Sequence, residues 1–197
     1  MFFQWGLCRD NFIQIDDPIN VDELYVPTPS VVLRRYVHPV AKKYLRRALL
    51  TNQAVTSSYG ERIYVSRLNI RERRLVNEEA CVKIFKQYGF DIIYPEQHTA
   101  AEQIAIFKKA KLIAGVAGSA MHNLIFSDRD TRVLFLASSG WLVVADNLIT
   151  SHFDHPLGYV IGNPLGYVGT HKRTQENWVI DMQDVEEAIR KHFFTQY

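Results

Sequence analysis

Between residues 62 and 136, short apolar runs alternate with segments of helical periodicity. The runs are RIYVS (62–66), FDIIY (90–94), KLIAG (111–115) and RVLFL (132–136). Their β-branched and aromatic residues favour strands. Helices are predicted over 77–88, 99–110 and 120–126, with Asn77 and Thr99 as start signals and Gly89 as a stop signal. Strands and helices that alternate over short links predict an α/β fold, a Rossmann-like parallel sheet flanked by helices.

The composition narrows the class of protein. The chain has 197 residues, of which 47% are hydrophobic, enough for one sizeable core. A net charge of only +2 argues against nucleic acid as a partner, and no apolar run is long enough to span a membrane. Cys8 and Cys81 form neither a disulfide framework nor a zinc motif. We therefore expect a cytoplasmic protein, with a peripheral position at the inner face of the membrane also compatible.

The remaining segments are less regular. A short strand is expected at 23–26, and a helix at 34–50 whose six Lys and Arg residues are either a solvated face or a surface for an anionic partner. Residues 141–167 are expected to form loops, and Asp181 to cap a last helix that runs to 194. We predict an N-terminal extension or remnant of another lobe over 1–58, and the Rossmann-like lobe over 59–197.

A glycine-containing turn follows the strand at 111–115. Gly115 and Gly118 allow a tight turn, and Ser119 either caps the next helix or donates its hydroxyl to a ligand. Because free N–H groups at a helix start attract anions, the turn is a candidate phosphate site. His122, one turn further on, either faces the ligand or is packed.

Arginine and carboxylate side chains supply further candidates. Arg67 ends the strand at 62–66, and its planar fork of donors suits a diphosphate. Glu102 has two interpretations, since Thr99 and Glu102 together form a capping box. Gln103 is equally ambiguous.

Metal and nucleophile motifs are not apparent. His152 and His155 flank a Phe-Asp pair, but no histidine spacing matches a zinc site, and no metal is expected. No nucleophile elbow is present either.

These features occur in one order that resembles a known family. The ordered motifs are YVSR (64–67), RRLVNE (73–78), GF (89–90), EQ (102–103) and GVAGSAMHNLIF (115–126). The set is similar to the family 61 glycosyltransferases, which include bacterial capsular-polysaccharide enzymes, plant xylosyltransferases and animal O-linked N-acetylglucosamine transferases. The match covers about residues 24–136.

The resemblance implies the C-terminal lobe of a GT-B glycosyltransferase, which holds a nucleotide-diphosphate sugar and needs no other cofactor. A glycan acceptor and a second lobe or subunit are the implied partners, and hexosyl or pentosyl transfer is the implied reaction. Arg67 would bind the donor phosphates. Gly118, Ser119 and Asn123 would shape the phosphate turn, and Glu102 would lie near the nucleotide or support its loop. The other substrate-binding residues that the resemblance implies are His122, Arg73 and Asn77.

Two features favour alternatives. Ala117 stands where many members have a histidine that reaches the diphosphate, and a complete acceptor lobe is not expected in this chain. We therefore expect a fragment of a longer enzyme, a split subunit or a degenerate copy, and a non-catalytic nucleotide-binding or interaction module is the alternative function. A nucleic-acid binder using the basic segments is a third hypothesis. Asp146, Asp154 and Glu96 are candidate general bases by position alone.

Overall fold

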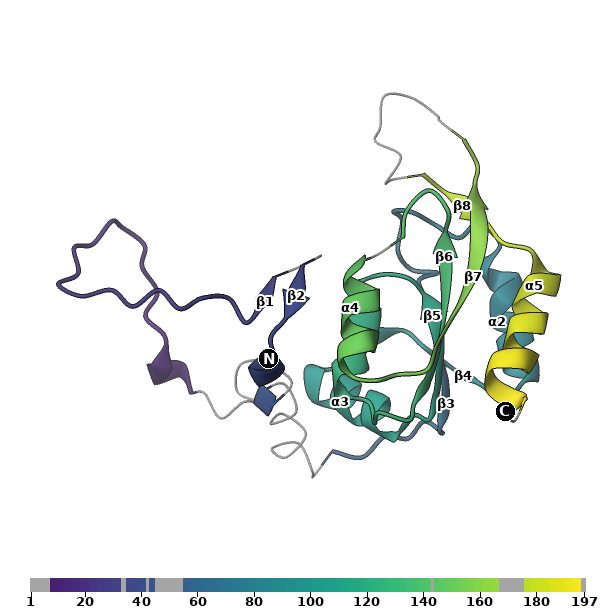
Figure 1. Ribbon diagram of the computed structural model, residues 1–197, viewed down its shortest axis with the longest axis horizontal. Coiled ribbons are helices and arrows are strands. Elements are labelled where there is room, and N and C mark those ends of the chain that lie inside the picture. The colour runs from purple at the N-terminus through teal and green to yellow at the C-terminus, as the bar shows by residue number, and fades with distance from the viewer. Residues whose placement is uncertain are drawn as a thin grey trace.

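The computed structural model describes residues 8–32, 35–41, 43–44, 55–142, 144–166 and 176–195. Its main feature is a twisted sheet with the strand order β4-β3-β5-β6-β7-β8 (Figure 1). The strands are β3 (Arg62–Val65), β4 (Asp91–Ile93), β5 (Leu112–Val116), β6 (Arg132–Ser138), β7 (Leu157–Pro164) and β8 (Trp178–Val179). All neighbours are parallel except β7 and β8, which are antiparallel. The predicted α/β, Rossmann-like architecture is confirmed.

Helices cover both faces of this sheet. On one face lie α2 (Glu78–Gln87) and α5 (Met182–Ile189), which continues into the π-helical turn η6 (Arg190–Phe194). On the other lie α3 (Ala100–Lys109), α4 (Val144–His152) and the 3₁₀ helix η4 (Ser119–Phe126), as Figure 1 shows. Each face has its own buried apolar cluster, with Phe85 in the first and Phe107 in the second. The sheet is therefore the middle of three layers.

The strand order contains a switch point between β3 and β5. From β3 the chain crosses to the edge strand β4, and then returns to the other side of β3 as β5. In open parallel sheets a crevice opens at the carboxyl ends of such a strand pair. At the end of β5, a Cβ on Gly115 would lie 2.8 Å from Sδ of Met121 and 2.9 Å from the backbone oxygen of Val65. Glycine thus lets η4 pack closely beside this crevice.

The local signals that begin and end helices are confirmed at several positions. Thr99 and Glu102 form both halves of the capping box. Gly89 follows α2 with a φ of +77°, a conformation that favours glycine. The carboxylate of Asp181 accepts the N–H of Gln183 at the start of α5. By contrast, Asn77 occupies the N-cap position of α2 without making a side-chain cap.

The prediction of loops over 141–167 is wrong. The segment contains α4 and the eight-residue strand β7. β7 pairs with β6 from Leu157 to Gly162, and this long-range ladder outweighs the low strand propensity of its glycines and proline.

The N-terminal predictions are corrected in part. No strand forms at 23–26, where the exposed chain has no neighbouring strand to pair with. Instead β1 (Val31–Val32) pairs with β2 (Tyr36–Val37), so the helix expected at 34–50 is replaced by a strand at its start. Residues 39–41 and 43–44 are helical, and 34, 42 and 45–50 lie outside the described residues, as do 1–7. The division at 58/59 stays a prediction.

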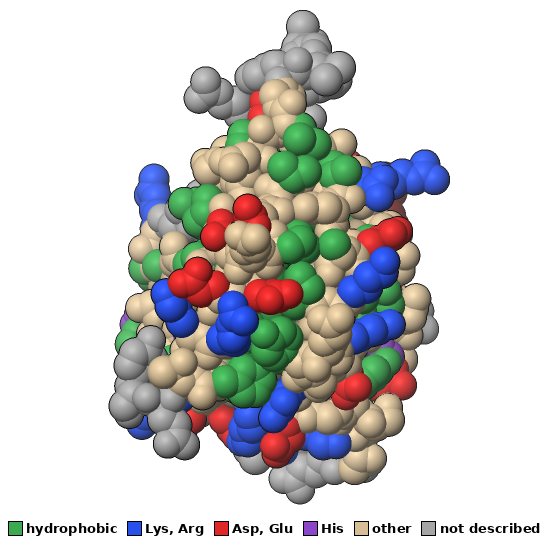
Figure 2. Space-filling view, turned by 90° about the vertical axis from the view of Figure 1, so that its right-hand side faces the viewer, with side chains coloured by type: hydrophobic (Ala, Val, Ile, Leu, Met, Phe, Trp, Pro, Cys, Tyr) green, Lys and Arg blue, Asp and Glu red, His purple; other side chains and the backbone are tan. Residues whose placement is uncertain are grey.

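Two short 3₁₀ helices, η2 (Arg9–Asn11) and η3 (Pro95–Gln97), complete the described elements. Figure 2 views the side of the molecule that carries α2 and α5, where acidic and basic side chains are interspersed with apolar ones. Within the described residues, no helix has the length and apolar character needed to cross a membrane.

Candidate functional site

A cavity of about 520 Å³ opens where β3 and β5 end. It lies at the switch point of the sheet, between the segments that follow β3, β4 and β5. Its lining residues are Ser66, Arg67, Ile70, Pro95, Glu96, Gln103, Ser119, Ala120, His122, Asn123, Ile125 and Phe126. Four predicted site residues, Arg67, Ser119, His122 and Asn123, are thus brought together from two separate strand ends.

Arg67 is half-buried at the end of β3, with its guanidinium packed over the glycine turn. A Cβ on Gly118 would lie 2.6 Å from Nη1 of Arg67, so the glycine makes room for this group. Burial lowers the pKa of Arg67, and the nearby carboxylates of Glu78, Glu72 and Asp146 oppose that shift. The side chain is therefore a cation flanked by acids, placed at the cavity wall.

Glu78 holds the backbone that carries Arg67. Its carboxylate is 1% exposed and accepts the N–H of Arg67 at 2.7 Å, the hydroxyl of Ser66 at 2.9 Å and the hydroxyl of Tyr64 at 3.3 Å. Burial raises the pKa of Glu78, and the three hydrogen bonds oppose that rise. As the first residue of α2, the carboxylate also faces the positive end of a helix. In the sequence, Glu78 stands out only as the last residue of the RRLVNE motif, because its contact with Arg67 depends on the fold.

The glycine turn leads directly into η4. Gly118 is its N-cap, with φ 159° and ψ 178°, and Ser119 is its first residue. Because no side-chain cap is made, the interpretation of Ser119 as a cap is wrong, and its hydroxyl is exposed at the cavity. The start of η4 therefore faces the same space as Arg67.

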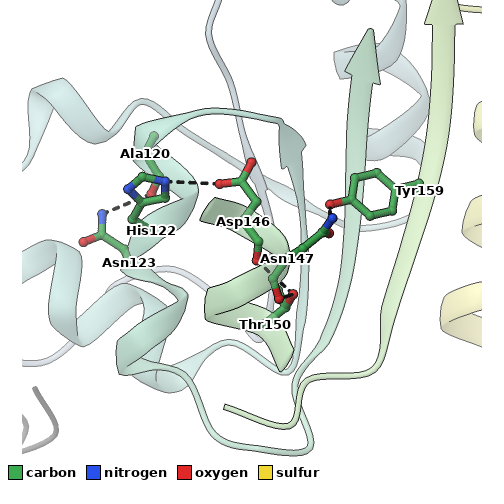
Figure 3. Close-up of polar contacts among 7 residues, drawn as sticks. All are labelled: Ala120, His122, Asn123, Asp146, Asn147, Thr150 and Tyr159. Atoms are coloured by element: carbon green, nitrogen blue, oxygen red, sulfur yellow. Dashed lines mark hydrogen bonds and ion pairs between the residues drawn. The ribbon is translucent and has the colours of Figure 1, made fainter. Parts of the chain in front are cut away.

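His122 and Asp146 form a close charged contact between η4 and α4 (Figure 3). Nε2 of His122 lies 3.2 Å from Oδ1 of Asp146, and the imidazole is 34% exposed while the carboxylate is 1% exposed. The two atoms are within ion-pair distance but lack hydrogen-bond alignment. Burial raises the pKa of Asp146, whereas His122, the backbone of Gly118 and Arg67 oppose that rise.

Asn123 joins η4 to α3. Its amide donates to Oε1 of Gln103 at 2.8 Å and to the carbonyl of Ala120 at 3.3 Å. Gln103 in turn donates to the carbonyls of Pro95 at 2.8 Å and His98 at 3.0 Å. These two amides fix the floor of the cavity, and this resolves the ambiguity of Gln103 in favour of a bridging role.

Comparison with known proteins adds the family. The sequence model described as "Glycosyltransferase 61" matches residues 1–134, more than half of the chain. The chain belongs to the glycosyltransferase 61 family. Membership of this family supports a glycosyltransferase-type function for the chain. The comparison with curated proteins found no match.

Two predicted site residues of this family 61 chain have structural partners instead. Glu102 accepts the N–H and the hydroxyl of Thr99 at 2.7 and 2.8 Å, and these bonds lower the pKa of Glu102. Asn77 donates to the carbonyl of Ile180 at 2.8 Å and accepts its N–H at 3.2 Å. Neither residue lines the cavity, so their roles in binding stay predictions.

Arg73 lies at a second, smaller cavity. Its guanidinium stacks on Trp141, 3.7 Å from the ring centroid, and its φ of +54° is unusual for a non-glycine residue. Ala117 and Trp178 line the same small cavity. Arg73 thus lines a different cavity from Arg67, although the charge of Arg67 lies near enough to help lower the pKa of Arg73, after burial as the main cause. A direct role for Arg73 in donor binding also stays a prediction.

The three candidate general bases of this family 61 chain lie in different surroundings. Asp146 is buried behind His122. Asp154 follows the last turn of α4 and precedes β7. It therefore lies near the amino ends of the parallel strands, whereas the cavity lies at their carboxyl ends. Glu96 is exposed on the cavity and accepts the side-chain amide of Asn69 at 2.7 Å. Glu96 is therefore the one of the three carboxylates that reaches the cavity directly.

No group of three potential metal ligands occurs among the described side chains, those of His152 and His155 included. His155 instead lies with Nε2 3.1 Å from the carbonyl of Leu124. The polar side chains that line the candidate site are a guanidinium, an imidazole, a carboxylate, two hydroxyls and two amides.

Proposed function

We propose that this cavity binds the diphosphate of a nucleotide sugar, and that the chain is the C-terminal lobe of a GT-B glycosyltransferase. The reaction would transfer a hexosyl or pentosyl group to a glycan, as in capsular polysaccharide synthesis. The observation that carries the proposal is the cavity itself, where Arg67, Ser119 and His122 meet at the switch point of a parallel sheet.

The chemistry of glycosyl transfer suits these groups. An acceptor hydroxyl attacks the anomeric carbon, the bond from that carbon to the diphosphate oxygen breaks, and the hydroxyl proton passes to a base. Negative charge grows on the leaving diphosphate, so cations and N–H donors aimed at it lower the barrier. Arg67 offers a planar fork for phosphate oxygens, and the start of η4 offers N–H groups beside the exposed Ser119 hydroxyl.

A second lobe or subunit would supply the glycan acceptor, and the base would come from that lobe or from Glu96. The cationic side chains would take the place of a metal, so the nucleotide sugar is the only small molecule that the proposal requires. A cytoplasmic location, at or near the inner face of the membrane, fits such a donor and acceptor.

Calorimetry with UDP, GDP and CMP sugars tests donor binding. We expect a UDP or a GDP sugar to bind more tightly than a CMP sugar, which carries a single phosphate, and Arg67→Ala to weaken that binding about tenfold or more, since a charge-assisted contact is worth about 1.5–3 kcal/mol. Arg71→Ala is the matched control, because Arg71 is an exposed arginine of the same loop that does not line the cavity. Absence of binding by all three classes, or equal affinity of wild type and Arg67→Ala, would refute the proposal.

The alternative is a nucleotide-binding module without transfer, which the apolar Ala117 beside the turn favours. A transfer assay separates the two functions. Donor binding without hydrolysis or transfer, even after an acceptor lobe is supplied, would support the module; turnover would support the enzyme.

A further inference from the structure

Asp146 is a buried acid whose charge must be compensated. Its side chain is 1% exposed on α4, and among the described residues neither carboxylate oxygen has an aligned hydrogen-bond partner. An uncompensated buried carboxylate is costly, so nearby positive groups decide its state. The groups around it are the imidazole of His122, the backbone N–H of Gly118 and the guanidinium of Arg67. All three belong to the wall of the proposed donor cavity or to its turn.

His122 connects this buried acid to the cavity. Nε2 faces Oδ1 of Asp146 at 3.2 Å, and Figure 3 shows the other ring nitrogen pointing away from Asp146. A carboxylate at this distance fixes the plane of the ring and turns the other nitrogen away from α4. The partly exposed ring lines the same cavity as Arg67, which leaves its other nitrogen available as a donor to a ligand.

We propose that Asp146 is a positioning residue that keeps His122 as a cation beside Arg67, so that the cavity presents two positive side chains to the two phosphates of the donor. This inference rests on the proposed function. Asp146 lies beyond residue 134, where the family match ends, so the match does not assign it a role.

A proton is part of this arrangement. The charged groups that face His122 are Asp146 from α4, Arg67 from the end of β3 and Glu96 across the cavity. Only the protonated imidazole can act as the second cation, so diphosphate affinity should fall as pH rises through the range in which histidines lose their proton. Removal of the Asp146 carboxylate should weaken diphosphate binding, because the imidazole then loses its neighbouring acid.

Calorimetric titration with a UDP sugar between about pH 6 and about pH 9 tests the inference, since this interval brackets histidine titration while the diphosphate of the sugar nucleotide keeps a constant charge. We expect His122→Gln to bind about tenfold more weakly than wild type at low pH and to lose the pH dependence, as one charge-assisted contact is removed. Asp146→Asn should bind like wild type at low pH and like His122→Gln near neutral pH. Asp130→Asn, at an exposed surface carboxylate, is the control and should match wild type throughout.

Titration of the wild type in buffers of different ionisation enthalpy gives a second readout that does not depend on a variant's folding. Proton uptake on binding of a UDP sugar, whose diphosphate does not titrate in this range, should be near zero at about pH 6 and positive at about pH 8. Zero uptake at both pH values would overturn the inference, as would normal UDP-sugar affinity of His122→Gln with lost turnover, which would make His122 a proton acceptor. The proposed function fails separately, if wild type binds no nucleotide or if Arg67→Ala binds as wild type does.

Discussion

At the scale of single residues, the cavity depends on two buried acids that contact its lining residues Arg67 and His122. Glu78 holds the backbone of Arg67, and Asp146 lies behind His122. Neither acid contacts the cavity directly. Burial of a carboxylate costs free energy, and the contact that each acid makes with Arg67 or His122 offsets this cost and holds that residue in position.

Glu78 should leave a signature in the pH dependence of stability. Its ordinary pKa of 4.5 is raised in the fold, mainly by burial. Below pH 4.5 both states are protonated, and as pH rises from there through the raised pKa the folded state loses stability relative to the unfolded state. Glu78→Gln removes this loss and keeps an oxygen acceptor. Urea unfolding should show wild type losing about 1.4 kcal/mol per unit of pKa difference relative to the variant; parallel pH profiles would contradict this account.

Gly118 and Gly115 should respond differently to alanine. At Gly118 the φ of +159° is strained for alanine and the new Cβ would meet the guanidinium of Arg67, so we expect weaker UDP affinity together with some loss of stability. At Gly115 the Cβ would meet the backbone of Val65, so a loss of about 1–3 kcal/mol in unfolding free energy is expected. Calorimetry and urea unfolding of both variants make the comparison. Equal UDP affinity of Gly118→Ala and wild type would show that the guanidinium position is unimportant.

Part of the site could be predicted from the sequence, because several of its residues directly follow predicted strands. Arg67, Ser119 and His122 follow predicted strands, and the carboxyl ends of parallel strands meet at one edge. The contacts of Glu78 and Asp146 could not be predicted. They join segments 11 and 24 residues or more apart along the chain, and no local pattern specifies such a contact.

At the scale of elements, several predictions that rest on local chemistry are confirmed, whereas a strand that depends on long-range pairing was missed. The start of α3 was predictable because Thr99 and Glu102 lie within one turn. β7 was missed because its sequence, LGYVIGNP, contains two glycines and a proline, and its ladders with β6 and β8 make it a strand. α4 was missed in the same segment, which carries Asn, Thr and Ser at positions where stronger helix formers are usual.

Asn77 ties two elements that are distant in sequence. Its side chain makes two hydrogen bonds with the backbone of Ile180, just before α5. Asn77→Ala leaves both backbone groups without this partner, so unfolding free energy should fall by about 1–3 kcal/mol in a urea titration. UDP calorimetry on the same variant tests the binding role that the family resemblance implies: unchanged affinity supports a structural role, whereas a large loss of affinity in a stable variant supports binding.

At the scale of the whole molecule, the layered sheet and the N-terminal segment differ in burial. Two apolar clusters stabilise the sheet from both faces, whereas the described residues 10–30 are exposed. Large apolar side chains, such as Ile13 at 86% and Tyr25 at 81%, are among the exposed ones. An acceptor lobe or another partner that covers them would agree with the proposed function.

Limited proteolysis of the full chain should reflect this difference. Protease should cut first within residues 10–30, because exposed backbone without sheet pairing fits a protease active site. Fragments that begin in or after this segment and retain the sheet should persist, as identified by mass spectrometry. Early cleavage inside β5 or β6 instead would contradict a stable layered core, and the boundaries of the persistent fragment would test the predicted division at 58/59.

The position of α4 carries one last consequence. This helix supplies Asp146 yet also covers a face of the sheet, so its own folding and the occupancy of the cavity are thermodynamically linked. A bound anion would slow the opening of α4, and its backbone amides would exchange with deuterium more slowly. The helix would then report, at a distance from the ligand, whether the cavity is filled.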